Sequence, residues 1–294
     1  MPENSKSLSI ILPAKNEARS LTTLVPILRN LHPEAEIIIV NDGSYDETAA
    51  SYQASDIRLV SHPYSMGNGA AIKTGARHAR GDILVFMDAD GQHRPEDIPK
   101  LLAKLEEGYD MVVGARDGEG QASMHRWAAN SFYNKLASWM TNQKVADLTS
   151  GFRAVRADKF REFLHLLPNG FSYPTTITMS FFRAGYSVAY VPIKVEKRVG
   201  KSHINLWRDG VRFLLIIFKV GTLYSPLKLF LPISLLHFLL GLGYYAYTFF
   251  TEGRFTNMSA LLLTTAVLVF LIGLVSEQIT TLIYQTRGDE HKHK

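Results

Sequence analysis

Two carboxylates one residue apart, Asp88 and Asp90, follow the apolar run Ile83–Met87. Side chains alternate along an extended chain, so residues i and i+2 point the same way and both carboxylates face one place. Gln92 follows within reach of that place. Mg²⁺ and Mn²⁺ relieve the repulsion between paired carboxylates, because these ions bind hard oxygen ligands together with substrate phosphates. The spacing therefore predicts a Mg²⁺ or Mn²⁺ site, with a capping turn before Pro95–Asp97 as the alternative.

Two more polar segments follow apolar runs elsewhere in the chain. Pro13–Glu17 comes directly after Leu8–Leu12, and Asn41–Ser44 comes directly after Ile37–Val40. Sheets of parallel strands bind ligands at the carboxyl ends of their strands, where such segments meet. Asn-Asp-Gly-Ser is also ordinary turn chemistry. Its occurrence together with the other two segments predicts a nucleotide site at one edge of a sheet.

The elements that would position these segments alternate in character along the first part of the chain. Apolar runs of strand length occur at Leu8–Leu12, Ile37–Val40, Ile57–Val60, Ile83–Met87 and Met111–Val113. Helical patterns occur at Glu17–Leu31, Asp46–Ala54, Ala70–Ala79 and Pro95–Glu107. This alternation is typical of βαβ units, so we expect an α/β domain with a Rossmann-like, mostly parallel sheet.

A competing interpretation comes from Gly67–Thr74, which nearly matches the P-loop pattern G-x4-G-K-[ST]. Asp82–Asp88 also resembles the second conserved strand of a P-loop NTPase. Ile72 stands where the pattern needs a glycine, and a β-branched residue lacks the required backbone freedom. Lys73 lies inside a helical pattern rather than at its beginning. We therefore expect the two glycines of this segment to open a helix, and a P-loop NTPase stays as an alternative.

Residues 221–286 differ in composition from the rest of the 294-residue chain. They contain four charged residues: Lys228, Glu252, Arg254 and Glu277. Leu229–Phe250 and Met258–Ser276 contain none, and each approaches the ~20 apolar residues that cross a bilayer. We expect two transmembrane helices joined by Thr251–Asn257, with two buried core helices as the alternative. This composition argues against a purely soluble protein, and the ordinary composition of residues 1–220 argues against a polytopic transporter.

Basic residues flank the apolar segments. Those before the first segment are Lys194, Lys197, Arg198, Lys201, Arg208, Arg212, Lys219 and Lys228, and those after the second are Arg287, Lys292 and Lys294. The positive-inside rule places both flanks in the cytoplasm. Met1–Ser9 has no apolar signal region. We expect a multi-pass protein of the cell (inner) membrane with its catalytic domain and both termini in the cytoplasm.

Four regions follow from these patterns. Residues 1–204 form the α/β domain, and residues 226–286 form a transmembrane hairpin followed by a basic tail at 287–294. Residues 205–225 combine arginines with a broad apolar face around Trp207 and Phe213–Phe218. That combination predicts a helix lying in the membrane interface, with a core helix of the first domain as the alternative.

The segments ILPAKNEA, VNDGS, MDADGQHRPEDI, VVGAR and DLTSGFRAVR occur in this order. As a set they resemble the family 2 glycosyltransferases of GT-A fold, and more narrowly the polyprenyl-phosphate glycosyltransferases of the dolichyl-phosphate mannose synthase group. The resemblance covers roughly residues 8–204. It implies inverting transfer of a sugar from a nucleotide-sugar donor, expected to be a UDP-hexose, to a polyprenyl phosphate at the membrane. The resemblance also suggests that the protein forms a homo-oligomer, and it implies no nucleic-acid partner.

The resemblance implies a role for each matching residue. Residues implied to bind the donor are Pro13, Ala14, Glu17, Asp42, Asp88, Ala89 and Arg116, the last of these at the donor phosphates. Asp88, Asp90 and Gln92 match the metal-binding pattern D-x-D-x-Q. Residues implied to act in catalysis are Asp90, Asp147, Arg126, Arg198 and Lys201. Within this last set, Arg126 would contact the acceptor phosphate. Asp147 together with Ser150–Arg153 would form the floor of the sugar site. Arg198 and Lys201 would clamp phosphates. Phe171–Thr178 lacks an acidic residue that many relatives carry, so the sugar contacts stay open.

The chemistry is consistent with the residues present. A phosphate monoester has a second pKa near ~6, so the acceptor is already a nucleophilic dianion at pH 7 and needs no general base. Bringing two anions together does require cations, and arginine and lysine are suited to that role. The absence of cysteine excludes a cysteine nucleophile and thiolate metal sites.

Two further alternatives are weighed against this one. A processive polysaccharide synthase carries Q-x-x-R-W, whereas four residues separate Gln121 from Arg126-Trp127 here, and two spans are too few to enclose a glycan channel. A catalytically inactive partner in a membrane complex is disfavoured by the intact Asp88, Asp90 and Arg116.

Overall fold

The computed structural model describes residues 6–52, 57–116, 124–170, 173–195, 218 and 221–285, with the backbone alone at 51, 124–130 and 285. The chain divides into two compact units, Met1–Ile204 and Asn205–Lys294. The predicted interfacial helix and basic tail lie largely outside the described residues, so both stay predictions.

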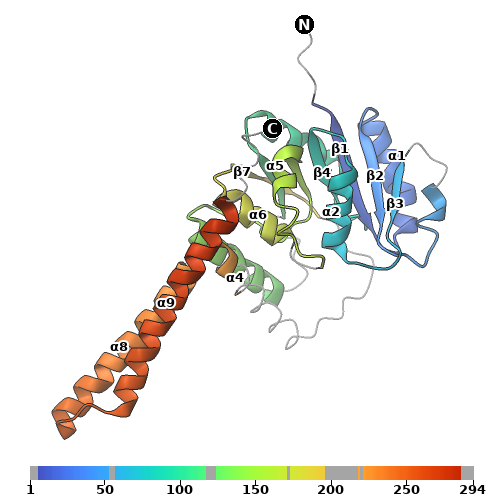
Figure 1. Ribbon diagram of the computed structural model, residues 1–294. Helices are drawn as coiled ribbons and strands as arrows, with labels where there is room; N and C mark the ends of the chain where they lie inside the picture. Colours follow the sequence, from blue (N-terminus) through green and yellow to red (C-terminus); the bar gives the residue numbers. More distant parts are fainter. Residues whose placement is uncertain are drawn as a thin grey trace. The chain divides into compact units, whose positions relative to one another are not determined.

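The first unit is built on a seven-stranded sheet of order β3-β2-β1-β4-β6-β5-β7 (Figure 1). The strands are β1 (Leu8–Ala14), β2 (Glu36–Asn41), β3 (Arg58–Ser61), β4 (Ile83–Phe86), β5 (Met111–Arg116), β6 (Arg153–Arg156) and β7 (Val188–Ile193). All neighbours run parallel except β6, which is antiparallel to both β4 and β5. The expected mostly parallel sheet is confirmed.

Six α-helices accompany this sheet within the described residues. They are α1 (Ala18–Leu31), α2 (Asn68–His78), α3 (Ile98–Glu106), α4 (Met124–Thr141), α5 (Ala157–Glu162) and α6 (Tyr173–Arg183). Two 3₁₀ turns, η1 (Ala50–Tyr52) and η2 (Pro95–Asp97), complete the connections. The sequence patterns located α1 to α3 within a few residues, whereas they did not indicate α5, α6, β6 or β7.

Alternating side chains of the central strands build a core on both faces of the sheet. Ile10 of β1 belongs to a buried cluster with residues of α1 and α3. Its neighbour Ile11 points the other way, and a Cβ added at Gly75 of α2 would lie 2.3 Å from its Cγ2. Phe86 is paired with Ile11 in the sheet and packs on Phe160 of α5, with ring centroids 4.6 Å apart. Helices α2 and α5 therefore cover one face, and α1 and α3 cover the other.

One predicted element is wrong over its described residues. The pattern at Asp46–Ala54 predicted a helix, but residues 46–49 form bends and turns and only the short η1 follows. The Asp46 carboxylate accepts hydrogen bonds from both the backbone and the hydroxyl of Thr48, and from the Ala18 amide at the start of α1. Aspartate side chains that bond nearby amides compete with helix formation. Here that competition yields a turn that caps another helix.

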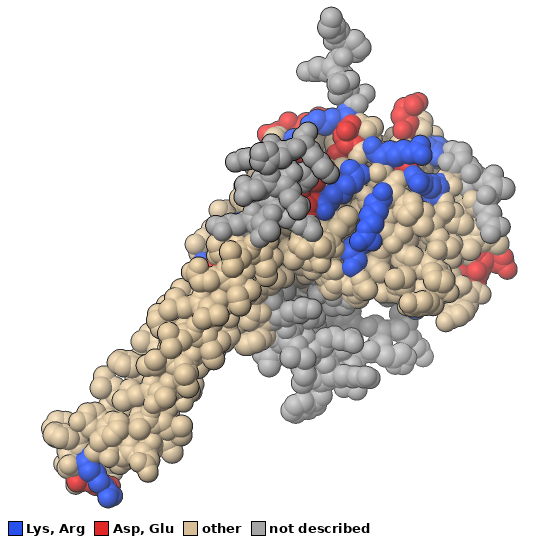
Figure 2. All heavy atoms as spheres, viewed as in Figure 1, with Lys and Arg blue, Asp and Glu red and all other residues tan. Residues whose placement is uncertain are grey.

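The second unit contains two long helices, α8 (Pro226–Glu252) and α9 (Asn257–Gln285). Both are long and apolar enough to cross a membrane, and only 11% and 17% of their most apolar windows are buried. Core helices of a soluble protein would be mostly buried, so this alternative is not supported. Apart from the charged atoms at the turn, their surface in Figure 2 is almost entirely uncharged.

Small residues hold the two long helices together. A Cβ added at Gly273 would lie 2.8 Å from the Cβ of Phe230, and one added at Gly241 would lie 3.0 Å from Leu263. The Ser234 hydroxyl donates to the Ala266 carbonyl at 2.7 Å. Close backbone approach over small residues and hydroxyl–carbonyl bonds are typical of helix pairs in membranes.

Candidate active site

The ends of three adjacent strands bring the polar segments together. β1 lies between β2 and β4, with Ala14 opposite Asn41 and Ile11 opposite Phe86. A cleft of about 480 Å³ lies at this edge of the sheet. Of the residues predicted to bind donor or metal, those lining it are Pro13, Ala14, Glu17, Asp42, Asp88, Ala89 and Asp90. These sequence segments, up to 77 positions apart, therefore form one site.

The local geometry of the carboxylate pair differs from the expected one. β4 ends at Phe86, and the chain turns at Ala89 and Asp90 rather than continuing extended. The Gln92 amide donates to Asp90 Oδ1 at 3.1 Å, across Gly91 with its φ of +74°. Both carboxylates still line the cleft. The turn therefore brings them to the same place, as the alternation of side chains along a strand was expected to do. Gln92 is not among the residues that line the cleft, so its predicted role as a metal ligand stays a prediction.

The charges of the cleft fit a cation that arrives with a phosphate. Four carboxylates line it, from Glu17, Asp42, Asp88 and Asp90, against one cation, Lys15. Among the described residues, no group of three or more His, Cys, Asp or Glu side chains is placed to hold a metal by itself. Mg²⁺ commonly uses one or two carboxylates, and takes its other ligands from water and substrate phosphates. Asp88 and Asp90 match that requirement.

Asp42 organises the loop opposite the carboxylate pair. Its Oδ1 lies 2.8 Å from His62 Nδ1 and accepts from the Met66 amide at 2.7 Å. Its Oδ2 accepts from the Ser65 hydroxyl at 2.8 Å and the Gly67 amide at 2.9 Å. Burial opposes ionisation of Asp42, but these hydrogen bonds hold the pKa of its carboxyl below the ordinary value. Asp42 therefore fixes one wall of the cleft, whatever contact it makes with a donor.

Arg116 and Asp147 form a two-point ion pair beside the cleft. Arg116 Nε donates to Asp147 Oδ2 at 2.8 Å, and Nη2 donates to Oδ1 at 3.0 Å. The amides of Thr149 and Ser150 donate to the same carboxylate. Burial opposes ionisation of Asp147, but the hydrogen bonds and charge of Arg116 lower the pKa of its carboxyl. The predicted phosphate-binding arginine is thus anchored to the predicted floor of the sugar site.

The segment after Asp147 is fixed from inside the protein. Arg153 is fully buried, and its guanidinium donates to the Pro174 carbonyl and the Thr178 hydroxyl, both at 3.2 Å, and to the Ser150 carbonyl. This arginine therefore ties the predicted floor to α6 rather than facing a ligand. A Cβ added at Gly151 would lie 3.0 Å from Asp88 Oδ2, so the predicted floor packs directly against a carboxylate of the predicted metal site.

The basic residues predicted at the acceptor side cannot be placed. Arg126 lies in α4, whose side chains are described only from residue 131 onwards, and Arg198 and Lys201 lie outside the described residues. Their roles stay predictions.

Comparisons with known proteins now decide the family. Residues 9–164, just over half of the chain, match Glycosyl transferase family 2, and residues 225–282 match the GtrB C-terminal hairpin. The chain belongs to glycosyl transferase family 2. An undecaprenyl-phosphate mannosyltransferase of Micrococcus luteus is 33% identical over 66% of this chain and 86% of its own length. CsbB of Bacillus subtilis, named as a glycosyltransferase, is 28% identical over 97% of this chain and 90% of its own length.

Solved structures support the same fold. Glucosyl-3-phosphoglycerate synthase of Mycobacterium tuberculosis, in a crystal structure with Mn²⁺ and UDP, superposes with a TM-score of 0.58 at 23% identity, covering 74% of this chain and 79% of that one. The GT-A fold expected from the motifs of the family 2 domain is therefore confirmed.

Several residues of the family 2 cleft were not predicted from the sequence. They are Ser65, Gly67, Asn68 and Ala71, whereas Lys15 belongs to the predicted segment Pro13–Glu17. The glycine-containing segment that resembled a P-loop does open a helix, as expected, because α2 begins directly after Gly67, whose φ is +101°. Lys73 lies within α2 and donates to the Leu167 carbonyl at 3.1 Å, so it ties α2 to a neighbouring loop.

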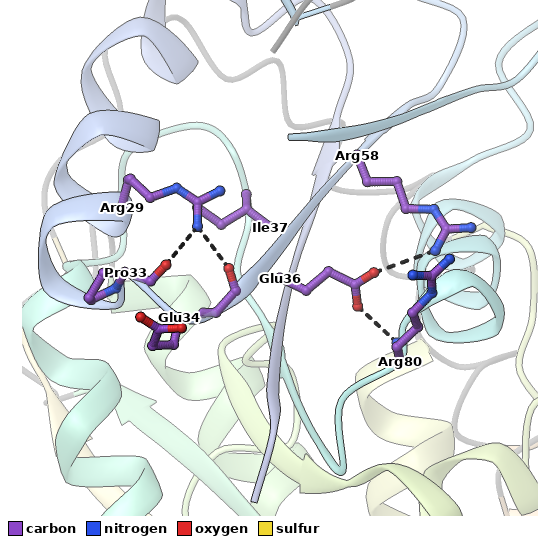
Figure 3. A pocket seen from close by; sticks show the side chains of 8 residues that line it. Arg29, Pro33, Glu34, Glu36, Ile37, Arg58 and Arg80 are labelled. Atoms are coloured by element: carbon purple, nitrogen blue, oxygen red, sulfur yellow. Dashed lines mark hydrogen bonds and ion pairs between the residues drawn. The ribbon is translucent and has the colours of Figure 1, made fainter. Parts of the chain in front are cut away.

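A second cleft, of about 460 Å³, lies where β2 begins and thus at the opposite edge of the sheet (Figure 3). Arg29 donates to the Pro33 and Ala35 carbonyls, and Arg58 donates to the Glu36 carboxylate and the His78 carbonyl. Glu36 also accepts from the Arg80 amide at 2.8 Å. These contacts join the ends of α1 and α2 to the sheet, and none of the predicted site residues lies here.

Proposed function

We propose that this protein transfers a hexose from a UDP-sugar to a polyprenyl phosphate at the cytoplasmic face of the membrane, with inversion at the anomeric carbon. The observation that carries the proposal is the combination, in one chain, of a family 2 domain with a hairpin of two membrane-length helices. A polyprenyl chain partitions into lipid, so an enzyme that uses its phosphate must work at headgroup level. The similarity to an undecaprenyl-phosphate mannosyltransferase supports this acceptor.

The transfer step follows from the chemistry of the two substrates. A phosphate oxygen of the lipid forms a bond to the anomeric carbon, while the bond from that carbon to the diphosphate oxygen breaks and UDP leaves with the electron pair. The acceptor is a dianion near neutral pH, so no side chain has to remove a proton. A divalent cation held by Asp88 and Asp90 would neutralise charge on the leaving diphosphate.

The protein side chains supply position and charge. Asp42 fixes the loop Ser65–Gly67 along one wall of the cleft. Asp147 holds the Arg116 guanidinium beside the cleft, where its charge favours an anionic group. Arg126, Arg198 and Lys201 are proposed to hold the lipid phosphate.

The test is a panel of radiolabelled sugar nucleotides, incubated with the full chain in proteoliposomes containing undecaprenyl or dolichyl phosphate. UDP-hexoses come first, because the crystal structure of the mycobacterial synthase that shares the fold contains UDP. Label that moves into the organic extract and is released by mild acid identifies the donor and the acceptor. Label recovered only in a water-soluble product or a polymer would contradict the proposal.

A matched pair of variants links the activity to the cleft. Asp90→Ala should reduce transfer at least a hundredfold and weaken Mn²⁺-dependent donor binding, because it removes one of the two carboxylates. Glu106→Ala removes a carboxylate that is exposed on α3 and should leave both unchanged. Near wild-type turnover of Asp90→Ala would show that Asp88–Asp90 is only a turn.

A further inference from the structure

His93 is an imidazole next to the cleft that the proposed reaction leaves without a role. It is 8% exposed, and its ring stacks on that of Phe152 with centroids 5.1 Å apart and planes 18° from parallel. Phe152 is itself fully buried in the segment that precedes β6. The ring of His93 is therefore held in one orientation by packing.

That orientation points one ring nitrogen at the proposed metal site. Nε2 of His93 lies 4.0 Å from Oδ2 of Asp88. Nδ1 is buried and has no hydrogen-bond partner among the described residues. A proton on Nε2 faces a carboxylate oxygen, whereas a proton on Nδ1 would face no acceptor and would leave a lone pair against that oxygen. The neutral ring therefore carries its proton on Nε2.

Asp88 is confined from a second side. Its Oδ2 lies against Gly151, where an added Cβ would be 3.0 Å away. Oδ2 is thus directed toward the interior, between Gly151 and His93, while the Asp88 side chain is 36% exposed and lines the cleft. A shift of about 1 Å would bring Nε2 and Oδ2 within hydrogen-bonding distance, and hydrogen bonds of active sites are often long before ligands bind.

We propose that His93 is a positioning residue, which donates a hydrogen bond from Nε2 to Oδ2 of Asp88 and so presents Oδ1 to a divalent cation. The inference rests on the proposed metal-dependent function. Metal-binding carboxylates are commonly held by such outer hydrogen bonds, and losing the partner typically weakens metal binding 10- to 100-fold.

The test measures Mn²⁺ binding directly, by electron paramagnetic resonance of free Mn²⁺, with the full chain in detergent and saturating UDP. His93→Phe keeps the stacked ring and removes the donor. His93→Asn places an amide near Nδ1, too short to reach Asp88, whereas His93→Gln places one near Nε2. We expect His93→Phe and His93→Asn to weaken Mn²⁺ binding 10- to 100-fold. The Mn²⁺ affinity of His93→Gln should stay within about threefold of that of wild type. His32→Phe, the same replacement at the end of α1, should bind Mn²⁺ as wild type does.

The outcomes separate this inference from the function on which it rests. If Asp90→Ala and wild type bound Mn²⁺ with equal affinity, the proposed metal site itself would be wrong. Loss of binding in Asp90→Ala with wild-type affinity in His93→Phe would overturn the role of His93 alone. Equal weakening in all three His93 variants would show that the ring acts by packing rather than as a donor. If His93→Phe does not fold, the comparison of the Gln and Asn variants decides.

Discussion

At the scale of residues, the carboxylates of the site differ in what surrounds them. Asp42 and Asp147 each accept several hydrogen bonds from the protein, so both act first as anchors of their loops. Asp90 accepts from the nearby Gln92 amide and stays at the cleft. Asp88 and Asp90, which line the cleft after β4, stay the predicted ligands of a cation.

The ion pair of Arg116 and Asp147 should contribute measurably to stability. Asp147→Asn should lower the free energy of unfolding by about 2 kcal/mol, because it leaves a half-buried guanidinium without the carboxylate that binds it at two points. The double variant Arg116→Met/Asp147→Asn should lose less than the sum of the two single variants, by about 1 kcal/mol or more. Chemical unfolding of the four proteins in detergent gives the coupling. Strictly additive losses would show that the pair has no energetic role.

His93 should make stability depend on pH. Burial lowers the pKa of His93 to about 4, so the folded protein binds its proton less readily than the unfolded chain, where the ordinary value is 6.5. Stability should therefore be complete above pH 6.5 and fall as the pH drops toward 4. His93→Gln has no such proton, so the free-energy difference between pH 7 and pH 5 should be about 2 kcal/mol smaller than in wild type. Identical pH dependence of the two proteins would contradict the neutral, buried state of the ring.

At the scale of elements, the start of α2 lines the cleft and packs against the loop before α6. The Ala70 amide donates to the Asn169 carbonyl at 2.8 Å. A Cβ added at Gly69 would lie 2.0 Å from the Pro168 carbonyl oxygen. The backbone of this loop thus lies directly on the first turn of α2, which also lines the cleft through Gly67 and Asn68.

Gly69→Ala should reverse the usual effect of this substitution in a helix. Replacing glycine by alanine inside a helix normally stabilises by up to about 1 kcal/mol. Here the added methyl group meets a backbone oxygen, so we expect a loss of about 1–3 kcal/mol, together with weaker binding of the nucleotide. Gly170→Ala is the control, because nothing lies within 4 Å of its added Cβ. Thermal unfolding and UDP titration measure both effects, and a stabilised Gly69→Ala protein would disprove the close contact.

At the scale of the whole molecule, the sheet, the cleft and the ion pair of Arg116 all belong to the unit Met1–Ile204. The second unit contains the hairpin of α8 and α9. Among its described residues, the hairpin offers no cluster of His, Asp or Glu side chains for chemistry. We interpret the hairpin as a device that keeps the catalytic unit at the membrane, where the proposed acceptor lies.

A protein ending near Leu223 should therefore fold and bind UDP and Mn²⁺ as the full chain does. It should lose most of its activity on long-chain polyprenyl phosphate in bilayers, because holding reactants in place contributes several kcal/mol to lowering a barrier. Rates of both proteins on the same proteoliposomes measure this loss, and a short-chain acceptor in detergent is the control on which they should be equal. Equal rates in bilayers would assign the hairpin another purpose, such as oligomerisation.

The sequence alone determined the features that depend on short continuous segments of the chain. Apolar runs followed by polar segments marked β1, β2 and β4. The edge of the sheet that holds the cleft followed from the rule that ligands bind at the carboxyl ends of parallel strands. Two uncharged stretches sufficed for α8 and α9, because length and composition decide whether a helix is able to cross a membrane. The motifs, taken together, also sufficed for the family.

Only the tertiary structure decided the partners of side chains distant in sequence. Arg116 and Asp147 are 31 positions apart, and nothing in either segment indicates that they form a pair. Strand β6 lies between β4 and β5 and runs antiparallel to both, although it follows both in the chain. The same packing buries Arg153 and sets His93 against Phe152. Such contacts depend on which surfaces meet after folding, whereas local patterns record only which face of an element is apolar.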